Sequence, residues 1–374
     1  MPRNRTIYNV LALYASQVPA TGVQTGLNTV RQLSRVQSFD EDFTRNFTDV
    51  NQYGNLAAID RLEVEAPDVT ASFSYYLTDG LNERLLGLTV PTSGAGGFAS
   101  QVSCVSGLLT KATDEKNYYL VIADEGNDAA GYTLARTGVI GIGNAFITSY
   151  SINAAVGDIP TADVELEGLN IRVYGQLQPG NLNDIPAVRP ADGQAITGVR
   201  FALPQAAAIT GGAIAAALLP GDITFSPTGT LGFSDSDLKV QDFTLTVDLP
   251  RTPLNRIGSR FAFSREIDFP VTSTLEMTAE VGDLESGNLV DLLCTNPNRD
   301  FTITMRNPSC AGTGTAAITY LFRGAKLTSQ SFSSSIGDNA TMTATYEVQI
   351  GSPQQTDRGI FISGSYPPFT APVV

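Results

Sequence analysis

The chain has no histidine and no tryptophan among its 374 residues. Without histidine it contains no Ser-His-Asp or Cys-His arrangement, no imidazole metal ligand and no side chain whose unperturbed pKa lies near neutral pH. Without tryptophan it lacks the aromatic platforms on which sugar-binding clefts usually depend. We therefore expect a protein with no catalytic residues, no metal site and no cofactor.

Cysteine and positive charge are also scarce. The three cysteines, Cys104, Cys294 and Cys310, are odd in number and lack the spacing of a zinc site, so they predict no disulfide framework and suit a reducing cytoplasm. Lysine and arginine total 23 against 37 acidic residues, for a formal net charge of −14. This balance argues against a surface that grips nucleic acid by its phosphates. It suits a wall that nucleic acid passes without adhering.

Long hydrophobic runs are interrupted. Pro204, Gly211 and Gly212 break the uncharged stretch Phe201–Leu219, so no membrane span is predicted there. Near the N-terminus, Asn9 interrupts the apolar run and no small-x-small cleavage site follows. We expect a first strand at this end rather than a secretory signal.

Several acidic and glycine-rich strings invite a functional interpretation. Asp40-Glu41-Asp42 and Asp124-Glu125 have the residue types of a glycoside hydrolase, but we interpret both as solvated acidic loops. Asp235-x-Asp237 has a calcium-like spacing without the glycine and closing glutamate of an EF-hand. Gly141-Ile142-Gly143 lacks the third glycine of a dinucleotide loop and precedes a strand. None of these strings predicts a site.

The second half of the sequence repeats the first. Ala145–Gly168 aligns without gaps on Ala325–Val348 at a constant offset of 180, with eight identical positions. An offset this long cannot be the period of a solenoid, so it indicates two copies of a whole domain. The alternative is a match by composition between Thr/Ser-rich strands.

Further matches follow in the same order along the chain. Val36-Gln37-x-Phe39 matches Val240-Gln241-x-Phe243 at an offset of 204, Glu63-Val64-Glu65 matches Glu266-Ile267-Asp268 at 203, and Tyr119 matches Phe301 at 182. The drop in offset predicts an insertion in the first copy at about residues 88–116, which we interpret as an outward-facing decoration. We expect a first domain over residues 1–178, a linker over 179–219 and a second domain over 220–374.

The local patterns are those of strands. Thr161–Glu167 alternates strictly, with Ala162, Val164 and Leu166 on one face and acids on the other, and Thr341–Val348 does the same. Gly157 and Gly337 mark hairpin turns between paired strands. Short leucine-rich helices are expected at residues 81–86 and 289–293. The sequence predicts a mainly β protein with two tandem, homologous β-sandwich or barrel domains, each with one short helix.

Distinctive strings lie towards both ends of the chain: Gln32–Ser38, Asp49–Arg61, Phe73–Tyr76, Gly324–Ser331, Ser335–Asp338 and Phe361–Tyr366. These strings resemble the tail tube proteins of tailed bacteriophages. The resemblance implies β domains that join edge to edge into rings, which stack into a hollow tube. Single-domain subunits of this family form rings of six, so a duplicated chain implies rings of three with pseudo-sixfold symmetry.

The resemblance also implies partners and a location. Expected partners are other copies of the chain, a tape measure protein in the lumen, terminator and baseplate proteins at the tube ends, and genomic DNA that passes without specific binding, with no membrane. The location is the virion tail, assembled in the host cytoplasm. Other virion ring or decoration proteins, such as a terminator, baseplate or capsid decoration protein, remain an alternative, as does an enzyme or a carbohydrate-binding module.

Two sets of site residues follow. Acid-bearing strand faces supply the candidates for the lumen: Glu63, Glu65, Asp163, Glu165, Glu167, Glu266 and Asp268. The family uses a long loop to reach the neighbouring ring, expected here at Arg45–Leu56 and Arg251–Gly258. The candidates for ring stacking are Arg45, Asn51, Tyr53, Gly54, Arg251, Asn255 and Gly258.

Overall fold

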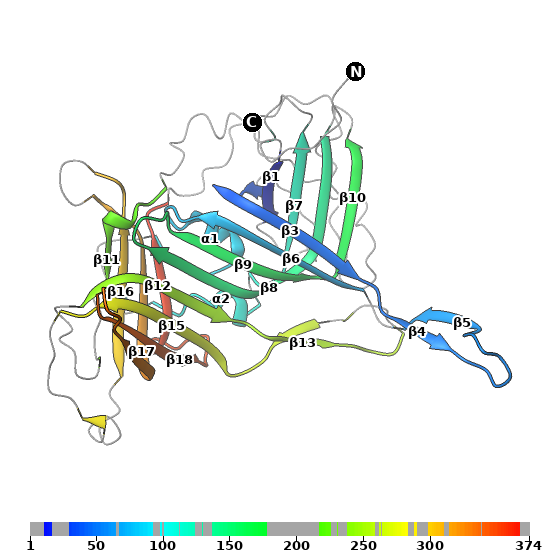
Figure 1. Cartoon of the computed structure of the whole chain (residues 1–374). Helices are drawn as coiled ribbons and strands as arrows, with labels where there is room; N and C mark the ends of the chain where they lie inside the picture. The colour runs from blue at the N-terminus through cyan, green and yellow to red at the C-terminus, as the bar shows by residue number, and fades with distance from the viewer. Residues whose placement is uncertain are drawn as a thin grey trace.

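A computed structural model describes residues 11–16, 30–64, 67–92, 98, 101–111, 113–123, 129, 137–177, 217–225, 230, 238–258, 262, 264–282, 288–289, 298–309, 314–337 and 339–366. This part of the chain is mainly β, as predicted. Fifteen strands form one hydrogen-bonded network, and two further pairs form separate hairpins (Figure 1).

The strands of the first half precede residue 178. They are β1 (Leu11–Ser16), β2 (Val30–Gln32), β3 (Val36–Thr44), β4 (Phe47–Val50), β5 (Asp60–Glu63), β6 (Asp68–Tyr76), β7 (Lys116–Ala123), β8 (Thr137–Ala155), β9 (Thr161–Gly168) and β10 (Asn170–Leu177). Alternation on β9 buries Ala162, Val164 and Leu166, which confirms the predicted face.

The strands of the second half follow a short 3-10 helix, η2 (Pro220–Asp222). They are β11 (Ile223–Phe225), β12 (Lys239–Asp248), β13 (Arg251–Leu254), β14 (Ser264–Ile267), β15 (Val271–Glu280), β16 (Arg299–Arg306), β17 (Ala316–Ser333), β18 (Thr341–Ile350) and β19 (Gly359–Gly364). On β18 the predicted apolar face is buried at Met342, Ala344, Tyr346 and Val348.

The pairing order of the two halves is the same. In the first half the ladder runs β3-β6-β9-β8-β7-β1, and β10 also pairs with β8. In the second it runs β12-β15-β18-β17-β16-β11, and β19 also pairs with β17. In both halves the long strand, β8 or β17, belongs to two sheets, because one end pairs with β7 or β16 and the other with β9 or β18.

Irregularities of the ladders recur at matching positions. The β3–β6 ladder shifts register between Val36 and Ser38, and the β12–β15 ladder between Val240 and Asp242. The skipped residue is a glutamine in both cases, and its side-chain amide donates to the backbone oxygen two residues earlier. A β-bulge re-aims a strand and is a specific feature of a fold, so the two ladders share more than their order.

A second recurring bulge lies on the long strands. The β8–β9 ladder shifts between Ile147 and Ser149, and the β17–β18 ladder between Leu327 and Ser329, at the sequence offset of 180. Elsewhere the registers correct the sequence alignment. The β7 and β16 ladders equate Tyr118, not Tyr119, with Phe301, and the hairpin ladders equate Glu63 with Ile267, not Glu266. Each correction is a shift of one residue. A shift of one residue matters because it would move every side chain of the strand to the opposite face of the sheet.

The two halves share one sheet. Strand β12 pairs antiparallel with the end of β8, from Asp242 opposite Ala155 to Asp248 opposite Ser149. The inner sheet therefore runs without interruption through eight strands, in the order β3-β6-β9-β8-β12-β15-β18-β17. A continuous sheet of this kind holds the halves in one fixed orientation.

The described part of the predicted insertion, residues 88–116, packs inward. Leu88, Val90, Cys104 and Leu108 are buried. The backbone of Cys104 donates to the oxygen of Ile360 at 2.7 Å. The described part of residues 88–116 therefore packs against the second half, and the outward-facing interpretation was wrong, because sequence spacing gives the length of an insertion but not its direction.

Helices are few and short. Helix α1 (Leu81–Leu86) has the predicted bounds, and α2 (Ser106–Leu109) lies in the insertion, where no helix was predicted. Apart from Leu289, the helix expected at residues 289–293 lies outside the described residues, as does most of the linker at 179–219. No helix in the described segments is long and apolar enough to cross a membrane.

Candidate functional site: a polar sheet face and two hairpins

One face of the inner sheet carries mostly polar and charged side chains. On β9, Asp163, Glu165 and Glu167 alternate with the buried residues, and the register places Ser72 of β6 and Ser149 of β8 beside Glu165. The same alternation continues across β12, β15, β18 and the end of β17. Hydrogen-bonded registers thus bring the polar faces of all eight strands onto one surface.

Acidic residues dominate this polar face. They are Asp40, Asp42, Asp68, Asp163, Glu165, Glu167, Asp242, Asp248, Glu276, Glu280 and Glu347. On the same face of the described strands, the cationic residues are Lys239 and Lys326. Carboxylates on neighbouring strands add their potentials, so the surface repels phosphate groups and attracts cations.

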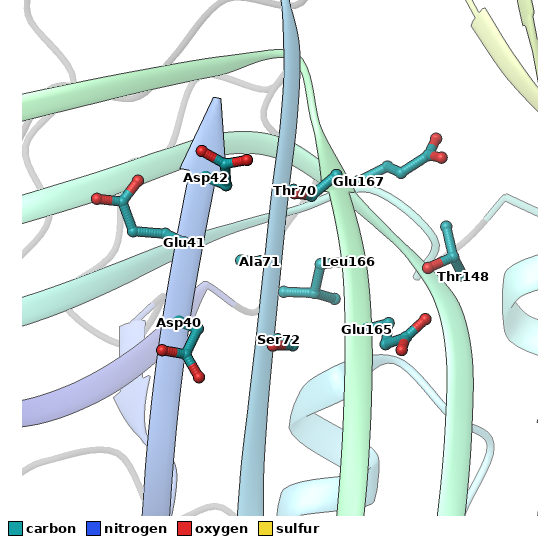
Figure 2. Close-up of a pocket in the computed structure, with 10 residues that line it drawn as sticks. All are labelled: Asp40, Glu41, Asp42, Thr70, Ala71, Ser72, Thr148, Glu165, Leu166 and Glu167. Carbon is teal, nitrogen blue, oxygen red and sulfur yellow. The ribbon is translucent and has the colours of Figure 1, made fainter. Parts of the chain in front are cut away.

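Figure 2 shows the most acidic part of the face, a shallow hollow over β3, β6 and β9. The carboxylates of Asp40 and Asp42 stand on one side of Thr70 and Ser72, and those of Glu165 and Glu167 stand on the other. No lining residue carries a positive charge. The hollow has the chemistry of a repulsive wall rather than of an anion site.

The structure separates the residues expected to line a lumen. Asp163, Glu165 and Glu167 lie together on the polar face, where Asn153 donates to Asp163 at 2.8 Å. Glu63 instead pairs with Arg45 at the base of the first hairpin. Glu65 lies outside the described residues.

The two second-half candidates also lie on a hairpin. Glu266 accepts from Lys111 and from Ser264, and these contacts lower the pKa of its carboxyl group. Asp268 accepts from the hydroxyl of Thr252 at 2.8 Å. Neither residue belongs to the eight strands of the polar face.

Sequence reasoning missed several acids of the face. Asp40-Glu41-Asp42 was expected in a loop, and this was wrong, because the segment pairs along β3 with Ser72, Ala71 and Thr70 of β6. The signal was present in the alternation of Phe39 and Phe43 with Asp40 and Asp42. The match of Val36–Phe39 to strand β12 could have extended the strand through this run.

The first hairpin, β4–β5, projects from the body of the protein (Figure 1). Its tip residues Asn51, Tyr53, Gly54 and Leu56 are exposed, with Tyr53 at 105% and Leu56 at 111%. Gly54 has a φ of +92°, which glycine adopts without strain. The stacking candidates of the first copy therefore lie on a projecting arm, and their contact with another ring stays a prediction.

Arginines surround the base of this arm. Arg45 donates to both carboxylate oxygens of Glu63, at 3.1 and 2.9 Å. The guanidinium carbons of Arg45 and Arg61 lie 4.8 and 5.1 Å from the ring centroid of Phe47, which is 40% exposed. Arg61 also pairs with Asp49 at 3.2 Å, and both of these side chains are exposed. Cation–π contact and ion pairing thus hold charged and aromatic groups together at the surface.

The second hairpin, β13–β14, has the same ladder but a different environment. Its registers repeat those of β4–β5 at an offset of 204, and Gly258 has a φ of +90°. Its base contacts the first half of the chain, where Arg265 pairs with Glu167 and Glu266 pairs with Lys111. Its tip, including Asn255 and Gly258, is exposed.

Arg251 is the most buried arginine of this hairpin base. Its guanidinium donates to both carboxylate oxygens of Asp114, donates to the backbone oxygen of Ile147 at 3.0 Å and lies 5.0 Å from the ring centroid of Phe146. The Arg251 side chain is 0% exposed and that of Asp114 is 7% exposed. Burial raises the pKa of Asp114, and the adjacent guanidinium partly offsets this. Arg251 therefore serves a contact within the chain.

A buried carboxyl group joins both halves in the core. One oxygen of Glu83 accepts from the hydroxyl groups of Tyr75 and Tyr150, at 2.9 and 3.2 Å, and Tyr150 contacts the hydroxyl of Tyr320 at 3.2 Å. Burial raises the pKa of Glu83 to about 7. All four side chains are buried, so we interpret the cluster as a stabilising network.

Other predicted groups give no site within the described residues. No three histidine, cysteine, aspartate or glutamate side chains there could hold a metal ion. Cys104 is buried and free, and burial raises the pKa of its thiol to about 12. Asp124-Glu125, Asp235, Asp237, Cys294 and Cys310 lie outside the described residues.

Comparison with known proteins gives a weak structural likeness. Neither a protein-family model nor a curated protein sequence matches the chain. Among solved structures, it is similar to the SPP1 tail tube, determined by solid-state NMR and cryo-electron microscopy, at 10% identity. The match covers 52% of this chain and 93% of that one, with a TM-score of 0.28. A TM-score this low does not establish a shared fold.

Proposed function

We propose that this protein is a structural virion protein that forms the tail tube of a tailed bacteriophage. Three chains, each with two homologous domains, close into a pseudo-hexameric ring, and rings stack around an acidic lumen. The observation that carries the proposal is the internal junction, where the inner sheet passes from β8 of one half to β12 of the next. Repeating that junction between chains extends the sheet until it closes.

The free edges of the sheet support this closure. Among the described residues, β3 pairs only with β6, and residues 327–333 of β17 pair only with β18. By the repeated registers, β3 corresponds to β12 and the end of β17 corresponds to the end of β8. The two open edges are thus of the same two kinds as the edges already joined inside the chain.

Side-chain exposure also supports the closure. Phe43 on β3 is 55% exposed, whereas its counterpart Val247 on β12 is 1% exposed. Phe332 on β17 is 56% exposed, whereas its counterpart Ile152 on β8 is 0% exposed. Large apolar side chains at an open sheet edge favour pairing with another strand, and ring closure removes that open edge.

The charge of the polar face supports its assignment to the lumen. Each chain has a formal charge of −14, so a ring of three carries −42. A channel wall lined by carboxylates repels the DNA backbone and prevents adhesion during passage. Asp163, Glu165, Asp40 and Asp42 are the residues that we assign to this wall.

The same proposal gives the partners and the place of action. The ring binds further copies of itself, surrounds a tape measure protein before ejection and DNA during ejection, and meets terminator and baseplate proteins at the tube ends. Stacking uses the exposed hairpin tips, with Tyr53 and Asn51 on one arm and Asn255 on the other. It assembles in the host cytoplasm and acts in the virion tail, without catalysis.

Electron microscopy of the purified protein at high concentration tests the proposal. Hollow tubes whose averaged end views have threefold symmetry and a six-lobed outline are the expected result. Single closed rings that never stack would indicate a terminator or baseplate ring instead. A monomer at every concentration, particularly one with saturable sugar binding, would overturn the proposal.

A further inference from the structure

We propose that the base of the β4–β5 hairpin is the docking element for a second copy of this chain, and that it binds the edge formed by β17 and β18. The contact centres on Arg61 with Glu347 and on Phe47 with Lys326 of the other copy. This inference rests on the proposed ring, and it names the side chains that hold neighbouring chains together.

The internal junction supplies the template. There the second hairpin lies against β8 and β9, with Arg265 paired to Glu167 and Arg251 over the ring of Phe146. Phe146 lies opposite Glu167 in the β8–β9 ladder. The two arginines at the base of the second hairpin thus contact two residues that lie opposite each other on β8 and β9.

The repeated registers match each residue of the internal junction with a residue at one of the two free surfaces. The hairpin ladders equate Phe47 with Arg251 and Arg61 with Arg265. The strand ladders equate Lys326 with Phe146 and Glu347 with Glu167, and Lys326 lies opposite Glu347 in the β17–β18 ladder. The four residues of the template therefore have four counterparts at the two free surfaces.

The chemistry of the counterparts is complementary. Arginine and glutamate occupy the ion-pair positions in both cases. In the other pair the cation and the aromatic ring exchange places, since Arg251 over Phe146 becomes Phe47 beneath Lys326. An exchange of this kind keeps the cation–π attraction. Phe47 and Lys326 do not meet within one chain, because Phe47 lies on the hairpin that follows β3 and Lys326 lies on β17, and β3 and β17 are the strands at opposite ends of the inner sheet.

The residues of the proposed interface are more exposed than the residues of the internal junction. The side chain of Arg61 is 68% exposed beside Asp49, whereas the side chain of Arg265 is 9% exposed beside Glu167. Phe47 is 40% exposed, and Phe146 is 7% exposed. When Arg61 turns to the neighbouring Glu347, it leaves the face of Phe47 and opens that face to Lys326.

The comparison of the two hairpins also explains why the first hairpin carries an apolar residue, Leu62, where the second carries Glu266. Glu266 of the second hairpin pairs with Lys111, which belongs to the insertion of the first half. Its counterpart on the first hairpin is Leu62, which is 49% exposed. The second half is shorter at the corresponding place, so a charged residue on the arm would meet no matching lysine, and leucine avoids the cost of burying an unpaired carboxylate.

The same template gives a backbone register between copies. Inside the chain, Thr244 lies opposite Asn153 and Thr246 opposite Ser151. Their counterparts place Asp40 opposite Ser333 and Asp42 opposite Ser331 of the next copy. This register keeps the acids of β3 on the polar face of the joined sheet.

A charge exchange tests the side-chain contact. Arg61→Glu and Glu347→Arg each place like charges at the interface, and we expect each to raise the concentration for half-maximal assembly at least tenfold. The double variant restores opposite charges and is expected to assemble within about threefold of the wild type. Double and single variants that assemble equally poorly would overturn the contact.

The matched control is Arg358→Glu. Arg358 is exposed beside Asp357, as Arg61 is beside Asp49, but it lies outside the proposed interface. It should assemble like the wild type. Thermal unfolding of each variant below the assembly concentration separates loss of the interface from loss of the fold.

Cysteine cross-linking tests the register. Asp42→Cys with Ser331→Cys should give a covalently closed ring of three under oxidising conditions, whereas Asp42→Cys with Gln330→Cys, one residue out of register, should not. Rings that form but cross-link only out of register would overturn this inference and leave the proposed function intact. A wild-type chain that never forms rings would overturn both.

Discussion

The guanidinium group of Arg265 forms an ion pair with the carboxylate of Glu167, and the two residues come from different halves of the chain. Their counterparts by register are Arg61, on the hairpin that follows the edge strand β3, and Glu347, on β18 beside the other edge strand, β17. The first pair is joined within the molecule, and we propose that the second pair forms between neighbouring chains. The contacts inside the chain therefore describe the contacts expected between chains.

Removal of Arg251 should weaken the internal junction. Arg251→Met leaves the buried carboxylate of Asp114 without its cation, and loss of one partner of a buried ion pair typically costs about 3–5 kcal/mol of unfolding free energy. Urea unfolding monitored by circular dichroism measures the change. In the control, Arg251→Met combined with Asp114→Asn should recover part of the loss, because no buried charge remains unpaired. A single variant as stable as the wild type would contradict the prediction.

The unfolding free energy should fall as pH rises, because the buried carboxyl group of Glu83 has a raised pKa. Its pKa is raised by burial from 4.5 to about 7, so the folded state binds a proton that the unfolded state releases above pH 4.5. The stability that this proton contributes is present below pH 4.5 and is lost as pH rises through 7, by about 3 kcal/mol in total. Glu83→Gln keeps an acceptor for Tyr75 and Tyr150 without a titrating group.

The measurement for Glu83 is a difference between proteins. Unfolding free energies of the wild type and of Glu83→Gln are compared from pH 4 to pH 8, so that contributions from other groups cancel. We expect the variant to gain stability relative to the wild type across the window from 4.5 to 7. A difference that does not change with pH would show that the carboxyl group does not titrate in this range.

Changes at the first hairpin tip should shorten tubes without unfolding the protein. Tyr53→Ser and Leu56→Ser remove fully exposed apolar groups, so the stability of the monomer should change by less than about 0.5 kcal/mol. Loss of contacts to the adjacent ring should leave rings intact while tube length falls, as measured by electron microscopy. Ile257→Ser provides the same change on the second arm. Normal tube lengths for all three variants would exclude a stacking role for both tips.

Neutral substitutions on the polar face should increase adhesion of DNA. Asp40→Asn, Asp42→Asn, Asp163→Asn and Glu165→Gln together remove four carboxylates from one half of the face while they retain polar side chains. Assembled tubes of this variant should bind short double-stranded DNA more tightly at low salt than wild-type tubes, and the difference should vanish as salt rises. Neutral substitution of the hairpin residues Glu63 and Glu266 is the control. Equal binding by all tubes would contradict a role of these carboxylates in repelling DNA.

Local periodicity predicted much of the fold. Alternation along Thr161–Glu167 and Thr341–Val348 gave the buried faces of β9 and β18, because side chains on a strand point alternately to its two faces whatever the strand packs against. Glycines at residues 157 and 337 gave the turns between long strands, and both have positive φ. The leucine-rich segment at 81–86 gave helix α1.

Tertiary contacts decided what periodicity could not. The acidic run at residues 40–42 was assigned to a loop because its composition is polar, yet its partner β6 makes it a strand. The position of the insertion depended on its contact with Ile360, which is far away in the sequence. The separation of Glu63 and Glu266 from the polar face likewise depends on hairpins that leave the sheet. These features arise from contacts between distant residues, which no local pattern contains.

The β8–β12 pairing has a consequence for the kinetics of assembly. In the proposed ring of three, one peptide chain would span two domain positions. Three of the six domain junctions would then form during folding, at an effective concentration set by the linker rather than by the amount of protein in solution. Only three junctions then require collisions between molecules and the loss of their translational and rotational freedom. Rings would then assemble from dilute solution in fewer steps. Because each chain contributes two domains, every ring, including a wrongly sized one, would contain an even number of domains.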